Sequence, residues 1–134
     1  MPIEYRSDAL LRSLAALHHA VPGIHGAAVI TQDGLVIASY PPGWDADIHD
    51  PTGGENVAAM AAVVAGLAER TMNRLDQGHL QRVVMEGARG TVGVFPATAD
   101  SVLALLIDKD AQLGLTLQAA RQATEQIRTI LKKN

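Results

Sequence analysis

The sequence contains no cysteine and few aromatic residues. Without cysteine the chain has no disulfide, no thiol nucleophile and no thiolate metal ligand, which agrees with a cytoplasmic location. Aromatic residues make up 3% of the chain, too few for a platform on which bases or sugars stack. The N-terminal segment MPIEYRSDALLRSL contains acids and no apolar run, so it does not resemble a signal peptide. The core must therefore be built from aliphatic side chains.

Excess positive charge and long hydrophobic runs are also lacking. The formal net charge is −3 and the isoelectric point is about 5.9, which argues against a nucleic-acid partner because such proteins present a basic face. The apolar run Val57–Ala68 is shorter than the roughly 20 residues that span a bilayer, so no membrane insertion is expected. A chain of 134 residues is expected to form one domain, residues 1–134.

No signature of catalysis or cofactor binding stands out. The histidines are scattered without paired metal-ligand spacing, and no serine lies in a nucleophile-elbow context. Asp45, Asp47, His49 and Asp50 offer ligands for a divalent cation, but a charged, solvated loop is the simpler interpretation. Arg89, at a predicted hairpin tip, is a conceivable arginine finger, although a solvated turn residue is again simpler. We therefore expect no catalytic residue, no cofactor and no metal.

Hydrophobic periodicity and turn residues predict the order helix, two strands, helix, three strands, helix. The predicted helices are Ile3–Ala20, a helix that begins at a capping box of Thr52 and Glu55 and runs through Leu75, and Leu113–Lys132. The predicted strands are Gly26–Thr31, Leu35–Tyr40, Leu80–Glu86, Thr91–Phe95 (closed by Pro96) and Val102–Ile107. Hairpin and meander turns imply a five-stranded antiparallel sheet. With helices on both faces, the fold class is an α+β sandwich of three layers.

The middle helix carries no polar side chain between Val57 and Ala68, so we expect it to be covered on both sides. Its bulky stripe, expected to fill the core, contains Val57, Met60, Val64, Leu67, Thr71 and Leu75. The opposite stripe of small residues is expected to face a second chain; it contains Ala58, Ala59, Ala62, Ala65 and Gly66, and continues to Glu69 and Asn73. The alternative is that alanine is simply a good helix former that tolerates water. Gly66 favours the first interpretation, because glycine costs helix stability unless close packing uses it.

Several segments resemble the roadblock family, which is named after a dynein light chain. They are GIHGAAVITQDGLVIAS, ENVAAMAAVVAGLAERTM, LQRVVMEGARGTVGVFPATADSVLALLID and LGLTLQAARQATEQI. The resemblance covers about residues 6–132 and lies in the combined order of apolar residues and glycines. It implies a profilin-like fold and a dimer in which the middle helices of two chains pair and the third strands join edge to edge. If those strands pair antiparallel about Val84, Arg82 of one chain lies opposite Glu86 of the other.

Roadblock proteins regulate or scaffold Ras-like small GTPases, and bacterial relatives include a regulator of gliding motility. The resemblance therefore implies a non-enzymatic cytoplasmic homodimer that binds such a GTPase. Partner contacts are expected near the ends of the paired helices, with Glu69, Arg70, Asn73 and Arg74 as candidates. Two alternatives stay open: a scaffold for a histidine kinase or another roadblock chain without effect on GTP hydrolysis, and a small-molecule sensor that uses the loop around Trp44.

Overall fold

The computed structural model describes residues 3–132 and contains three helices around one sheet. The helices are α1 (Ile3–Ala20), α2 (Gly54–Arg74) and α3 (Leu113–Lys132). The strands are β1 (Ile24–Thr31), β2 (Val36–Tyr40), β3 (Val83–Glu86), β4 (Gly90–Thr98) and β5 (Ser101–Asp108). This order is the predicted one.

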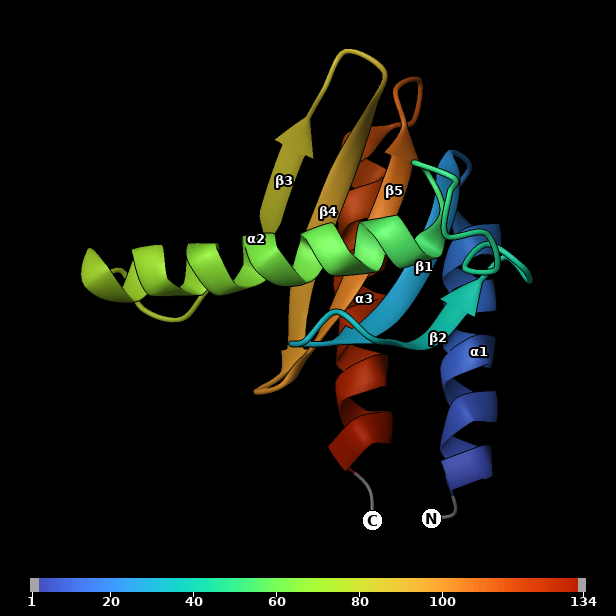
Figure 1. Ribbon diagram of the computed structural model, residues 1–134, viewed down its shortest axis with the longest axis horizontal. Coiled ribbons are helices and arrows are strands. Elements are labelled where there is room, and N and C mark those ends of the chain that lie inside the picture. Colours follow the sequence, from blue (N-terminus) through green and yellow to red (C-terminus); the bar gives the residue numbers. More distant parts are fainter. Residues whose placement is uncertain (1–2, 133–134) are drawn as a thin grey trace.

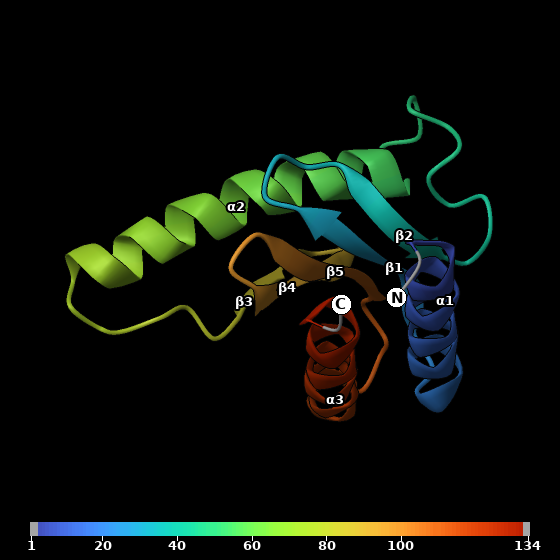
Figure 2. The same cartoon turned by 90° about the horizontal axis from the view of Figure 1, so that it is seen from below.

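The sheet is antiparallel throughout and has the strand order β2-β1-β5-β4-β3. Figure 1 shows α2 crossing one face of the sheet, and Figure 2 shows α1 and α3 on the other face. The predicted three-layer α+β sandwich is thus confirmed. β5 is central and almost entirely buried, as its lack of polar residues on either face predicted.

Two aliphatic clusters hold the three layers together. Between the sheet and the α1/α3 layer, Leu10 and Leu14 of α1 pack with Ile127 of α3 against the strands. The smaller cluster beneath α2 includes Ile30 and Trp44. The strands therefore need apolar side chains on both faces.

Two predicted boundaries were wrong. Pro96 does not close its strand, because β4 continues to Thr98 with Pro96 opposite Val102 of β5. β3 pairs with β4 only as far as Val94, so β4 has no β3 neighbour at the proline, and a proline is tolerated at such an edge. The capping box is also absent: the N-cap of α2 is Gly53, with no side-chain cap.

The orientation of α2 is the main correction to the sequence analysis. Its sheet-facing side consists of Val57, Ala58 and Ala61, which are buried. By contrast Met60 and Leu67, predicted to fill the core, are exposed. The sheet and Trp44 supply the bulk of this cluster. Of the predicted bulky stripe only Val57 is buried, and Met60 and Leu67 are left outside.

Candidate interaction surface

Three bulky apolar side chains of α2 are exposed on the side that does not rest on the sheet. We call them the α2 stripe: Met60 (62% exposed), Val63 (63%) and Leu67 (57%). Their spacing along the helix places them within one third of its circumference. α2 also extends beyond β3, so its C-terminal part has no strand of its own sheet beneath it (Figure 1). A side chain of the stripe can therefore be buried only by another molecule.

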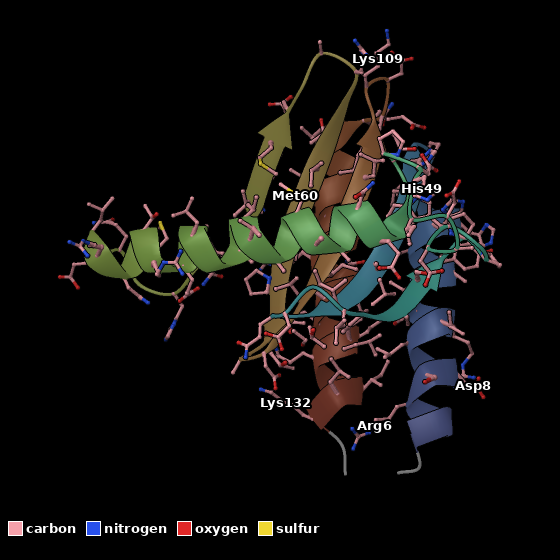
Figure 3. All side chains as sticks on the ribbon, viewed as in Figure 1. Arg6, Asp8, His49, Met60, Lys109 and Lys132 are labelled. Atoms are coloured by element: carbon pink, nitrogen blue, oxygen red, sulfur yellow. The ribbon has the colours of Figure 1, made fainter. Side chains whose placement is uncertain are left out.

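The edge strand β3 lies beside this stripe. It pairs regularly with β4, from Val83 opposite Val94 to Glu86 opposite Thr91, and its other edge has no neighbour in the sheet. Val83 packs into the cluster beneath α2, so Met85, two residues later, points to the same face and is 39% exposed. Met60 lies where α2 borders the uncovered part of β3 and β4 (Figure 3). Met60 of the stripe and Met85 of the strand are thus exposed apolar side chains near the open edge of the sheet.

The other edge of the sheet is protected against pairing. The register of β2 against β1 shifts between Val29 and Ile30, and Pro41 follows the strand directly. Bulges and prolines are the devices by which edge strands avoid further partners. β3 has neither of these devices, so it is the edge that is better suited to extension.

The predicted dimer residues on α2 differ in their burial. Ala58 lies between α2 and the sheet of its own chain and is 0% exposed. It therefore cannot contact a second chain, and this assignment was wrong. Ala59 is exposed, whereas Ala62, Ala65 and Gly66 are half-buried. The small residues were predicted to face a second chain and Met60 to fill the core, whereas Val63 and Met85 were assigned no interface role. Their exposure depends on which side of α2 meets the sheet, which periodicity does not decide.

Glu69 has a role within its own chain. Its carboxylate accepts a hydrogen bond from the backbone N–H of Leu80 (3.2 Å) and lies 3.4 Å from Nδ1 of His79. Leu80 is buried, so these contacts fix the connector between α2 and β3 beneath the helix. The strand predicted from Leu80 consequently begins only at Val83.

The remaining predicted contacts are accessible. Arg82 and Glu86 flank the half-buried Val84 and are both exposed at the free edge. The candidate partner residues Arg70, Asn73 and Arg74 are exposed on the last turns of α2. In residues 3–132 neither of these two arginines forms an ion pair.

The loop before α2 is organised around Trp44. The indole Nε1–H donates a hydrogen bond to the carbonyl of Thr52 (2.8 Å), and the ring is buried. A Cβ at Gly26 would overlap this ring, so the indole lies directly on the β1 backbone. The Trp44 ring therefore fills the space between this loop and the β1 backbone at Gly26.

The acids of this loop stabilise turns. Asp47 Oδ1 accepts a hydrogen bond from the backbone of His49 (2.9 Å), and Asp50 Oδ1 accepts two from Thr52, from its backbone N–H (3.0 Å) and its hydroxyl (2.9 Å). The backbone bond, followed by the hydroxyl bond, holds the pKa of Asp50 below its usual value. Within the described part of the chain, no three His, Asp or Glu side chains are grouped to hold a metal ion.

None of the helices in residues 3–132 is both long and apolar enough to cross a membrane.

This chain is similar in sequence and in fold to known proteins. The chain is 36% identical to the uncharacterized protein MJ1340 of Methanocaldococcus jannaschii over 109 residues, which cover 81% of this chain and 88% of that one. The gliding protein MglB of Thermus thermophilus has the same fold, with a TM-score of 0.80 at 22% identity over 93% of this chain and 90% of that one. Acanthamoeba castellanii profilin II is a more distant neighbour, with a TM-score of 0.54 at 14% identity over 90% of this chain and 97% of that one, so the fold is profilin-like. The Roadblock/LC7 domain matches residues 10–107, and the chain belongs to this family.

Proposed function

We propose that this protein is a non-enzymatic homodimeric regulator that binds a Ras-like small GTPase and modulates its nucleotide cycle or localisation. The observation that carries the proposal is the exposed α2 stripe together with the open edge of β3. A second copy of the chain is the occupant that fits it best, because an antiparallel strand edge is complementary to itself under a two-fold axis.

Charge supports this pairing. With Val84 at the two-fold axis, the exposed Arg82 of one protomer lies opposite Glu86 of the other, and each dimer has two such cross-strand pairs. The same arrangement brings the C-terminal part of α2, which extends beyond the edge of its own sheet (Figure 1), beside α2 of the partner.

The energy of burying the stripe is of the required size. Fully burying an aliphatic side chain contributes about 1.5–3 kcal/mol, and each stripe residue still exposes close to 60% of its surface. Six such side chains in a dimer then contribute roughly 5–11 kcal/mol. That offsets an association cost of roughly 4–15 kcal/mol, and backbone pairing of the β3 edges adds to it.

The GTPase part of the proposal rests on membership of the Roadblock/LC7 family and on the MglB-like fold. The mechanism is conformational: a rigid two-helix platform that binds one switch state more tightly shifts the GTPase toward that state. The exposed Arg70, Asn73 and Arg74 at the end of α2 are the side chains we assign to partner contacts.

Two measurements test the proposal. Light scattering should give twice the chain mass of 14.1 kDa. Calorimetry with a Ras-like GTPase from the same organism, loaded with GDP or a non-hydrolysable GTP analogue, should give different dissociation constants for the two states. Arg74→Glu should weaken binding at least about fivefold, whereas Arg121→Glu, an exposed position on α3, should not.

Absence of binding to either nucleotide form would refute the GTPase assignment and leave the dimer untouched. Binding that changes neither the hydrolysis nor the exchange rate would favour the scaffold function instead.

A further inference from the structure

A cavity of about 690 Å³ lies on the side of α2 away from Met60. Its apolar wall consists of Ala62, Ala65 and Gly66 of α2 together with Leu80 and Val102. The turns that join β1 to β2 and β4 to β5 form its rim. The volume is within the range of cavities that hold small ligands or one or two side chains of a partner.

Gly66 gives this cavity space that the chain itself does not use. A Cβ at this position would meet only an Nη atom of Arg70, at 3.9 Å. A glycine inside a helix costs up to about 1 kcal/mol relative to alanine, yet no packing within the chain requires one here. The absent side chain leaves the helix backbone open toward the cavity.

The rim carries two carboxylates whose charge is not neutralised. The two turns are tied together, because the backbone N–H of Gln32 donates a hydrogen bond to the carbonyl of Asp100 (3.0 Å). Asp33 and Asp100 therefore stand on neighbouring turns at one end of the cavity. In the portion of the chain that the structure describes, neither forms an ion pair; Asp100 only accepts a hydrogen bond from the Thr98 hydroxyl.

The cations around the cavity do not offset these acids. Arg128 donates hydrogen bonds to the carbonyls of Ala97 (2.6 Å) and Pro96 (3.3 Å) and pairs with Glu125 (3.3 Å). Arg70 belongs to the α2 wall, together with Glu69. The rim end of the cavity thus carries two unpaired carboxylates, whereas Ala62, Ala65 and Gly66 form an apolar part of its wall.

From this combination we propose that the cavity binds a peptide segment of a partner protein that places an apolar side chain against Ala65 and Gly66 and a lysine or arginine between Asp33 and Asp100. An apolar side chain removes the wall from water, and a cation on the rim pairs with both carboxylates. The site is separate from the α2 stripe and shares only Arg70 with the residues that we assign to the GTPase.

Two dipeptide probes test the site by NMR on the full-length protein. N-acetyl-leucyl-arginine amide should shift the backbone amide signals of Ala65, Gly66 and Asp100 saturably. N-acetyl-leucyl-glutamate amide should bind roughly tenfold more weakly, because it meets like charge at the rim. Asp33→Asn and Asp100→Asn should each weaken binding of the basic probe roughly fivefold.

Substitutions at Gly66 provide the steric test and its control. Gly66→Leu fills the cavity while raising helix propensity, so it should abolish binding in a folded protein. Gly66→Ala adds one methyl into open space and should retain binding. The proposal is overturned if both probes bind equally, if the shifts map elsewhere, or if Gly66→Leu binds like wild type. Dipeptide binding is measured without the GTPase, and the dimer mass and GTPase affinity of the wild-type protein are measured without the dipeptides, so the two proposals fail separately.

Discussion

Leu67→Ala is the most direct perturbation of the proposed dimer. Leu67 is 57% exposed in the single chain, and full burial of a leucine contributes about 1.5–3 kcal/mol. The part of its surface left for a partner is then worth on the order of 1–1.5 kcal/mol. A symmetric dimer contains two copies, so the substitution should raise the dimer dissociation constant about 30- to 150-fold.

Leu115→Ala on α3 is a matched control. Leu115 is also a helical leucine and is 54% exposed, but it lies on the opposite layer of the sandwich (Figure 2). Leucine and alanine both have high helix propensity, so both variants should fold and unfold at similar urea concentrations.

Sedimentation velocity over a dilution series distinguishes the two outcomes. We expect Leu67→Ala to dissociate at a higher protein concentration than wild type, and Leu115→Ala to behave as wild type. If both variants retain the wild-type dissociation constant, the α2 stripe is not the dimer contact and the reasoning from its exposure is wrong.

Two further predictions concern the Trp44 loop. Gly26→Ala should lower the free energy of unfolding by about 1–3 kcal/mol in urea titrations, because its Cβ overlaps the Trp44 ring; Gly114→Ala, with no atom within 4 Å of its Cβ, should not destabilise. The hydrogen bonds from Thr52 lower the folded-state pKa of Asp50. They therefore stabilise the folded loop at pH values above the ordinary aspartate pKa, and this stabilisation is lost as the pH falls through the lowered pKa. Trp44 fluorescence should report an acid transition below about pH 4 that Asp50→Asn removes; an unchanged transition would contradict this.

Local chemistry was sufficient to predict the order of the elements. The Asp33-Gly34 turn indicated the first hairpin, the uninterrupted apolar run of β5 indicated a central strand, and helical periodicity indicated α3, all of which the structure bears out. These signals depend on residues that are close in sequence. For that reason they fail at Pro96 and at the start of α2, where the outcome depends on a neighbouring strand or on a packed loop.

The sequence by itself also determined that α2 has one bulky and one small side. Only the tertiary structure decided that Val57, Ala58 and Ala61 rest on the sheet and that Gly66 lines the cavity, while Met60 and Leu67 face outward. Periodicity indicates which residues share a face of the helix. It does not indicate which face is buried here, because both faces of this helix are apolar enough to be buried. The choice is made by the space that β1, β4, β5 and Trp44 leave beneath the helix, and that space exists only once segments distant in the sequence have packed together.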